Sequence, residues 1–578
     1  MTDSTFLGDG PITADNNVIT TDDDPIATSD DFMSWIAQYS QRTNRSLAGA
    51  RLIINDPETH SGITTIAQQW GMTVADASTL FPNTQVSTHN NDGTQHSGDV
   101  PNYGTVPNYC GVHNNDGAQR NGSAHGNASN NNTSNNNTSN NDAFCFDSTE
   151  PISSVPDMRQ STGFEAMAYA EKHMPVLRTV LAELRERGVD FTGVRIAVCL
   201  ILEPKTAVLL RSLKAAGAIV GVYCGPDSTD PRVAEQLQRE GIIVESSRKW
   251  TPAQAHEAAL RLLDTIQPDI IIDDGASFAR LASLERPELT AQLIGVAEET
   301  TSGVRAFAGM EEAGALTYPV VAVNDSVMKT GFDNAHGTGE TCVTTMQRIL
   351  GADAFVGTTV TVIGYGPVGR GFARRIRALG AQVTICDIDP VASLKAVFDG
   401  FAARDIDDAL PTSDIVISAT GVRHTVTLDH MRHMRTGTTL AVIGGIANEI
   451  ALDDVPDFIS QVNRDLVELH VPDGPTLTLI ADGDGVNYTV GGGNPIEIMD
   501  LSFAVQASAV AYLLEHRGTL PNRLIRLDAD TDQCIASAAL KARGYQASHA
   551  VADNGYDWRL TRFAENARHE DSNNNSQI

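Results

Sequence analysis

From about residue 161 onward, apolar and polar positions follow two alternating periods. Met, Ala, Val and Leu recur at helical spacing over 164–188, which predicts an amphipathic helix. Short apolar runs, VRIAVCLIL (194–202) and AIVGVYCG (218–225), predict buried strands, and helical stretches separate them. Strands that alternate with helices at short spacing indicate a parallel sheet with crossover helices. The pattern therefore predicts an α/β unit.

A second unit of the same kind begins near residue 340. Helical patterns alternate there with apolar runs that end in Gly or Asp, and a long apolar helix follows at 496–516. The tail holds one further predicted helix, at 531–544. The fold class is therefore α/β, with two Rossmann-like parallel-sheet domains. The predicted strands of this second unit are 360–366, 382–390, 414–421 and 438–445.

The first 150 residues have a different composition. Residues 1–30 are polar, and 83–150 are rich in Asn and Ser, with too few apolar residues to offset chain entropy. We expect both segments to be disordered, so the N-terminal extension is largely disordered. Between them, 31–82 is a small segment with two predicted short helices and a strand over 50–56, to which the sequence assigns no role.

Charge and cysteine content exclude several classes of function. The chain has 41 Lys and Arg against 72 Asp and Glu, a net charge of −31. Such a surface repels nucleic acid and anionic lipid, so we expect neither as a partner. The N-terminus lacks the basic and apolar regions of a signal peptide. The seven cysteines form no CxxC pair, which argues against a zinc site or a disulfide framework. We predict a cytoplasmic protein without a metal.

A glycine turn follows the predicted strand at 360–366. Gly364 permits the tight turn, Gly366 lets the backbone approach a pyrophosphate, and Gly369 lets helix and strand pack closely. The helix N-terminus then faces the phosphates with its positive dipole end. Asp387 ends the next strand, where a carboxylate bonds the adenosine ribose and repels a 2′-phosphate. The turn predicts NAD as the cofactor.

A polar cluster lies just upstream of this turn. Lys329, Asp333 and Asn334 fall within six residues of one another, which beside NAD suggests chemistry on a hydroxyl-bearing carbon. A Lys and an Asp four apart are also the ordinary pattern of a surface helix ion pair. The acidic run Asp273-Asp274-Gly275 ends a predicted strand, where α/β sheets bind ligands, although it also fits an ordinary turn.

These segments resemble one family, S-adenosylhomocysteine hydrolase. Its NDSVxKxxFDN signature reads NDSVMKTGFDN at 324–334, and its GYGxVGxG turn reads GYGPVGRG at 364–371. The resemblance covers roughly 161–516. It implies a substrate domain at 155–335, an NAD-binding domain at 336–500, and a C-terminal helix with a divergent tail at 501–578.

The resemblance also implies site roles. The family oxidises the ribose 3′-hydroxyl, removes the C4′ proton, expels the 5′ thiol, adds water and restores the hydroxyl. Lys329 and Asp333 would move protons at the 3′-hydroxyl, Glu299 would bind ribose hydroxyls, and Asp274 matches the family's DDGGD segment. The implied cofactor-binding residues are Thr300, Thr301, Asn334, Gly364, Gly366, Val368, Gly369, Asp387, Thr420 and Asn487.

Several family positions differ in this chain. Three family histidines are replaced by Ile201, Gly445 and Asn494, and the family's Lys-and-Tyr tail, which reaches a neighbour's NAD, has no match. Glu203, Lys205 and His336 are candidate replacements. The favoured function is NAD-dependent hydrolysis of S-adenosylhomocysteine or a similar 5′-thioether nucleoside by a homo-oligomer. Two alternatives remain, a catalytically inactive NAD-binding paralogue with a binding or regulatory role and a dehydrogenase that releases NADH.

Overall fold

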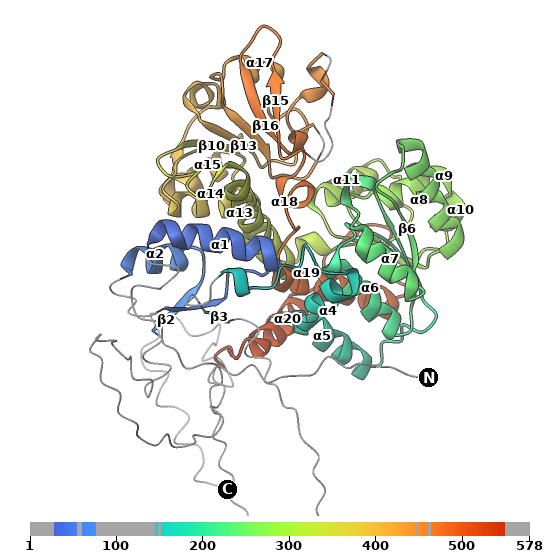
Figure 1. Cartoon of the computed structure of the whole chain (residues 1–578). Helices are drawn as coiled ribbons and strands as arrows, with labels where there is room; N and C mark the ends of the chain where they lie inside the picture. Colours follow the sequence, from blue (N-terminus) through green and yellow to red (C-terminus); the bar gives the residue numbers. More distant parts are fainter. Residues whose placement is uncertain are drawn as a thin grey trace, which may run out of the picture.

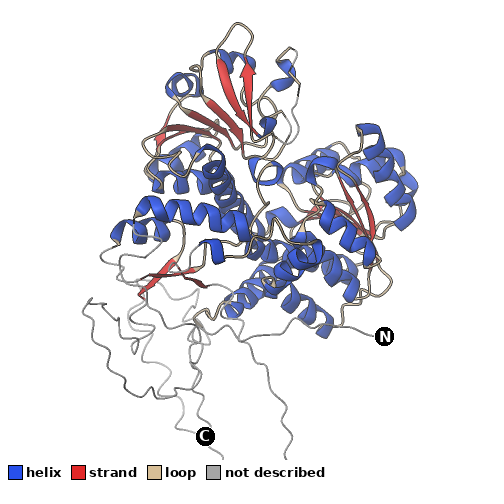
Figure 2. Cartoon of the chain, in the orientation of Figure 1, coloured by secondary structure: helices blue, strands red, loops and turns tan. Residues whose placement is uncertain are grey.

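The computed structural model describes residues 28–54, 60–76, 145–147, 152–446, 448–456, 458–459 and 464–549. These residues form two large sheets, each with helices packed on it, and a small three-stranded sheet (Figures 1 and 2). Nearly all of 1–30, most of 83–150 and the polar end of the tail lie outside the described residues. The predicted disorder of these segments therefore stays a prediction.

The first large sheet is parallel throughout, with strand order β17-β9-β8-β7-β4-β5-β6. Its central strands β7 and β8 are buried along their whole length, as expected of a sheet covered on both faces. Helix α8 begins at Pro252 behind a capping box between Thr251 and Gln254. The strands are β4 (Arg195–Cys199), β5 (Ile219–Cys224), β6 (Ile243–Ser246), β7 (Ile270–Asp273), β8 (Gly295–Glu298), β9 (Val320–Ala322) and β17 (Leu524–Ile525). The helices are α4 (Gly163–Lys172), α5 (Pro175–Glu186), α6 (Pro204–Ala215), α7 (Pro231–Arg239), α8 (Pro252–Ile266), α9 (Ser277–Glu285), α10 (Pro287–Thr290) and α11 (Thr301–Glu312).

The second large sheet has strand order β12-β11-β10-β13-β14-β16-β15. Its last pair, β15 and β16, is antiparallel, and the other pairs are parallel, so the predicted Rossmann-like fold class is confirmed. The burial of β15 alternates because one face of this edge strand meets solvent. The strands are β10 (Thr359–Ile363), β11 (Gln382–Cys386), β12 (Ala402–Ala403), β13 (Ile415–Ser418), β14 (Thr439–Val442), β15 (Leu466–His470) and β16 (Thr476–Ile480). The helices are α13 (Thr338–Leu350), α14 (Pro367–Ala378), α15 (Pro390–Phe398), α16 (Ile406–Ala409), α17 (Leu428–Arg432) and α18 (Val486–Thr489).

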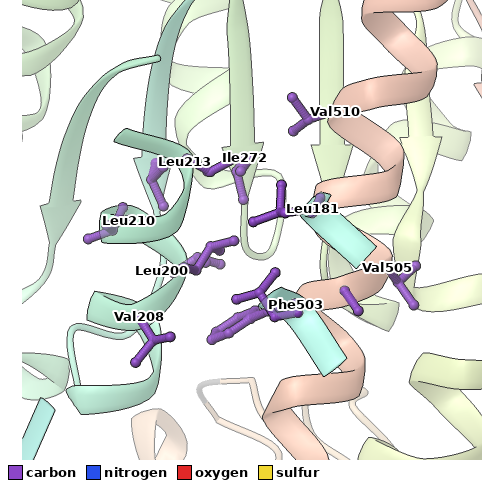
Figure 3. Close-up of a cluster of buried hydrophobic side chains, with 14 of the residues drawn as sticks. Leu181, Leu200, Val208, Leu210, Leu213, Ile272, Phe503, Val505 and Val510 are labelled. Atoms are coloured by element: carbon purple, nitrogen blue, oxygen red, sulfur yellow. The ribbon is translucent and has the colours of Figure 1, made fainter. Parts of the chain in front are cut away.

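Helix α19 (Ile496–Glu515) is the central helix of the first unit. It packs against α5 and against α20 (Ala529–Ala542), and Figure 3 shows Phe503, Val505 and Val510 of α19 in the same apolar cluster as Leu181 and Ile272. By length and composition α19 could span a membrane, but 94% of its most apolar window is buried inside the fold. The predicted boundary at 500/501 falls within this helix.

The segment before residue 77 forms part of the same structure. Helix α1 (Ser29–Thr43) packs along α13, and α2 (Ser61–Gln69) lies beside it (Figure 1). Strands β1 (Arg51–Ile54), β2 (Thr73–Asp76) and β3 (Cys145–Asp147) form the small parallel sheet. The two helices and the strand expected within 31–82 are therefore confirmed.

Candidate functional site

A cavity of about 880 Å³ lies between the carboxyl ends of the two large sheets. In the first sheet, strand order reverses between β7 and β4, and the residues after both strands line the cavity. In the second sheet the reversal lies between β10 and β13, and Val368 and Gly421 line the cavity there. Such switch points are where open α/β sheets bind ligands. The fold therefore brings two ligand-binding edges face to face.

Adjacent acids at these edges have different surroundings. Asp273 accepts backbone hydrogen bonds from Phe278 and Ala279 at the start of α9. Glu298 accepts from the backbone N–H groups of Gly275 and Ala276. Asp273 and Glu298 thus hold the loop after β7, and neither lines the cavity.

Their neighbours along the chain, Asp274 and Glu299, both line the cavity. Burial raises the pKa of the Asp274 carboxyl above its ordinary value, although the Lys329 ammonium opposes the shift. Successive side chains at a strand end point to opposite sides, which separates the two structural acids from the two that face the ligand space.

Lys329, Asp333 and Asn334 lie together at the cavity wall. Lys329 Nζ is 3.0 Å from Asp333 Oδ2 and donates to Asn334 Oδ1 at 2.9 Å. Lys329 and Asp333 are 5% and 2% exposed, so the pair is buried and is not a surface ion pair. The segment Thr330–Gly337 is a π-helix, a form that often marks functional sites.

The charges around Lys329 set its protonation. Burial by itself lowers the pKa of its ammonium, but the Asp333 carboxylate, together with Glu299 where that group is ionised, outweighs burial and raises the pKa above the ordinary value. The amine is therefore held charged by its protein neighbours. Lys329 can act as a base only when a positively charged ligand nearby offsets these negative neighbours and lowers its pKa.

Glu299 has an unsatisfied oxygen. Gln506 of α19 donates to Glu299 Oε2, while Oε1 is buried and has no hydrogen-bond partner among the described residues. Burial raises the pKa of the Glu299 carboxyl to about 8. An unpaired buried acceptor beside a cavity is costly unless a ligand pairs with it. Glu299 is therefore suited to bind a ligand hydroxyl.

The raised pKa of Glu299 predicts a pH-dependent stability. Between its ordinary value of 4.5 and about 8, the folded protein keeps a proton that the unfolded chain has released. Stability from this group is therefore lost as pH rises through that window. In Glu299→Gln, which stays neutral and can still accept from Gln506, we expect Tm to fall less between pH 5 and pH 8, by on the order of a few degrees. Thermal unfolding of both proteins at the two pH values measures this, and parallel pH dependences would contradict it.

The glycine turn has the geometry that a dinucleotide site needs. Gly364 has φ +98°, a conformation that favours glycine. A Cβ on Gly369 would lie 2.0 Å from the Gly364 carbonyl oxygen, so only glycine lets α14 approach β10 this closely. A Cβ on Gly366 would meet nothing within 4 Å, which leaves its backbone open to a ligand. These residues fit a dinucleotide pyrophosphate at the start of α14.

Of the other predicted cofactor residues, Asp387 and Thr420 contact this turn. Asp387, at the end of β11, accepts from the backbone N–H of Tyr365 at 2.6 Å, and a Thr420 methyl lies 3.0 Å from where a Cβ on Gly364 would be. Asn487 donates to Asn494 Oδ1 at 2.9 Å. The predicted residues that line the cavity are Thr300, Thr301, Asn334, Val368 and Asn487, besides Lys329, Asp333, Asp274 and Glu299.

The three positions where the sequence lacks a family histidine all face the cavity. Ile201, Gly445 and Asn494 are among its lining residues. Asn494 Nδ2 donates to Asp333 and, at 3.1 Å, to Thr338 Oγ1. Asn494 therefore orients the Asp333 carboxylate, although an amide cannot exchange a proton as an imidazole does.

The three candidate replacements for these histidines differ in whether they face the cavity. Glu203 lines the cavity, and burial raises the pKa of its carboxyl despite the opposing Lys205 ammonium. Lys205 lies outside the cavity lining, 2.8 Å from Glu203. His336 also lies outside it, against Arg375, and burial lowers its pKa to about 4. Of the three, Glu203 is the one that faces a ligand.

Two polar residues of α19 support the site and were missed in the sequence. Ser502 Oγ donates to Asp333 Oδ2 at 3.0 Å, and Gln506 donates to Glu299. They lie four residues apart in a mostly apolar helix, so they share one face. That spacing was the available signal for a polar stripe facing the site.

Comparisons with known proteins agree with this geometry. Residues 334–493 match the family model described as S-adenosyl-L-homocysteine hydrolase, NAD binding domain, and residues 153–286 match the model described as S-adenosyl-L-homocysteine hydrolase. An adenosylhomocysteinase of Thermoplasma acidophilum is 38% identical over 67% of this chain and 95% of its own length. The chain belongs to the S-adenosyl-L-homocysteine hydrolase family.

Other members of the S-adenosyl-L-homocysteine hydrolase family show similar coverage. An adenosylhomocysteinase of Thermococcus kodakarensis is 39% identical over 66% of this chain and 91% of its own. An S-inosyl-L-homocysteine hydrolase of Methanopyrus kandleri is 37% identical, with the same two coverages. NAD is the cofactor of this family member, and it fits the glycine turn. The α1 segment lies outside both family models.

Proposed function

We propose that this chain hydrolyses S-adenosylhomocysteine to adenosine and homocysteine, with NAD bound. The observation that carries the proposal is the buried Lys329–Asp333–Asn334 cluster, which shares one cavity with Glu299, Asp274 and the start of α14. NAD, when bound, supplies reversible oxidation of a ribose hydroxyl. It would be held by Gly364, Gly366, Val368, Gly369 and Asp387, with Thr300, Thr301, Thr420 and Asn487 around them.

The protein's own groups supply binding and proton transfer in this proposal. Glu299 Oε1, which lacks a partner among the described residues, receives a ribose hydroxyl. Lys329 and Asp333 hold and move the proton at the 3′-hydroxyl. They form one buried ion pair, so a proton can pass between the two side chains. Ser502 and Asn494 keep Asp333 in place. Ionisable side chains at Glu203 and Asp274 remain to serve the 5′ side of the reaction.

The first test measures free thiol released from S-adenosylhomocysteine by NAD-loaded protein. S-inosylhomocysteine is the matched second substrate, because it differs only in the purine and one relative bears the name S-inosyl-L-homocysteine hydrolase. We expect release from the adenosyl compound at a kcat of about 1 s⁻¹ or more. Release from the inosyl compound alone would mean that S-inosylhomocysteine, and not S-adenosylhomocysteine, is the substrate. Release from neither, with NAD bound, would favour the inactive NAD-binding paralogue, and accumulating NADH would favour a dehydrogenase.

A homo-oligomer and a cytoplasmic location remain part of the proposal. Support for an oligomer comes from an exposed apolar face on the second unit, where Ile388, Leu394 and Phe398 are exposed. Patches of this kind often mark contacts between protein copies. The predicted division into a substrate domain and an NAD-binding domain is also part of the proposal. We assign α19 to the substrate domain, because it packs against the helices of that unit.

A further inference from the structure

The chain passes between the two large sheets twice, at 323–358 and at 481–495. The end of α1 and the residues after it contact α13 in the first crossing and the start of α19, directly after the second. Gln41 donates to Thr345 on α13 at 3.1 Å, and the backbone N–H of Leu47 donates to the buried Glu340 on the same helix. The backbone N–H of Ser46 donates to the buried Glu497 on α19 at 2.8 Å. The N-terminal segment therefore ties the two crossings together.

Asn44 of this segment does not line the cavity itself, but it contacts residues at the cavity edge. It ends α1 in the left-handed conformation, with φ +52°. Its side-chain Nδ2 donates to the Gly493 carbonyl at 3.0 Å, and its Oδ1 accepts from Lys205 Nζ at 2.5 Å. Its backbone carbonyl accepts from the Ile496 N–H at 2.9 Å. One side chain thus bridges α6 and the second crossing.

Both partners of Asn44 adjoin cavity residues. Lys205 Nζ lies 2.8 Å from Glu203 Oε2 and donates to the Gly492 carbonyl at 2.9 Å. A Cβ on Gly493 would lie 2.4 Å from Glu203 Oε2, so Glu203 is packed against this loop. The next residue, Asn494, donates to Asp333. Glu203 and Asn494 both face the ligand space.

We propose that Asn44, supplied by a segment outside both family models, is a positioning residue of the active site. It holds Lys205 and the Gly493 carbonyl in place, and through them it fixes the Glu203 carboxylate and the Asn494 amide toward the substrate. The N-terminal segment therefore completes the site. The inference rests on the proposed function, because the substrate it concerns is the nucleoside thioether.

The left-handed conformation of Asn44 determines the test variants. Asn44→Gly removes both side-chain hydrogen bonds and keeps the backbone free of strain, since glycine adopts this conformation readily. Asn44→Asp keeps the acceptor for Lys205 and loses the donor to Gly493. Gln38→Ala changes an exposed residue of the same helix and is the matched control.

We expect Asn44→Gly to raise KM for S-adenosylhomocysteine by about 10-fold with a smaller change in kcat, because it loosens groups that bind the substrate. Asn44→Asp should fall between Asn44→Gly and wild type, and Gln38→Ala should match wild type. Bound NAD and Tm, measured alongside, should change little in Asn44→Gly. A residue that only stabilises the fold would not raise KM while leaving bound NAD and Tm unchanged.

The outcomes separate this inference from the proposed function. A wild-type KM in Asn44→Gly would overturn the inference, as would a joint loss of Tm, NAD and kcat, which would make Asn44 a general structural residue. If wild type releases no thiol, the proposed function fails. Calorimetric titration of the NAD-loaded proteins with S-adenosylhomocysteine then decides the inference: weaker binding in Asn44→Gly supports it, and equal or absent binding overturns it.

Discussion

Replacing Lys329 with methionine should reduce kcat for thiol release by on the order of 10³-fold while NAD remains bound. Methionine keeps most of the side-chain volume but removes the ammonium that contacts Asp333 and Asn334. NAD should remain because the glycine turn at 364–369 is untouched. The measurements are kcat from a free-thiol assay and NAD released on denaturation. Wild-type turnover in this variant would remove Lys329 from the mechanism.

A second variant separates catalysis from folding. Losing the ammonium leaves the Asp333 carboxylate, which is 2% exposed, buried without a counter-charge. Breaking a buried ion pair in this way costs about 3–5 kcal/mol. The double variant Lys329→Met, Asp333→Asn removes the stranded charge and keeps a group that accepts from Ser502. We expect Tm to recover in the double variant and activity to stay absent. Recovery of both would mean that the pair serves the fold alone.

Replacing Gly369 with alanine should abolish stable NAD binding. The new Cβ would lie 2.0 Å from the Gly364 carbonyl oxygen and 3.3 Å from Ala419 Cβ, so α14 must move away from β10. Overpacking of this kind costs about 1–3 kcal/mol, and here it displaces the turn that faces the pyrophosphate. We expect at least about a 100-fold loss of NAD affinity with a lowered Tm. Bound NAD per chain and thermal unfolding measure these effects.

Gly309→Ala is the matched control for this substitution. Gly309 lies within α11 and is exposed, and a Cβ added to it would meet no atom within 4 Å. Alanine should therefore leave NAD binding unchanged and stabilise the helix by about 0.5–1 kcal/mol. If Gly369→Ala retained NAD as fully as Gly309→Ala, the turn at 364–369 would not be the cofactor cradle.

Local pattern predicted most of the elements but not their edges. The strand over 194–202 and the helix over 496–516 follow from periodicity that each segment carries in its own residues. The antiparallel strand β15 was missed, although its alternation of exposed and buried residues fits an edge strand. The predicted cut at 500/501 fell within α19, because composition does not reveal which sheet a helix packs against.

The sequence by itself determined the strand–helix alternation and the glycine turn, because periodicity and a positive φ depend on neighbouring residues. It also placed Lys329, Asp333 and Asn334 within reach of one another. Only the tertiary structure showed that the Lys329–Asp333 pair is buried, because the same four-residue spacing is also that of a surface ion pair. Here α19 covers the pair and brings Ser502 against Asp333. The tertiary structure also separated Asp273 from Asp274. The role of Asn44 depended wholly on folding, because its side-chain partners lie 161 and 449 residues further along the chain.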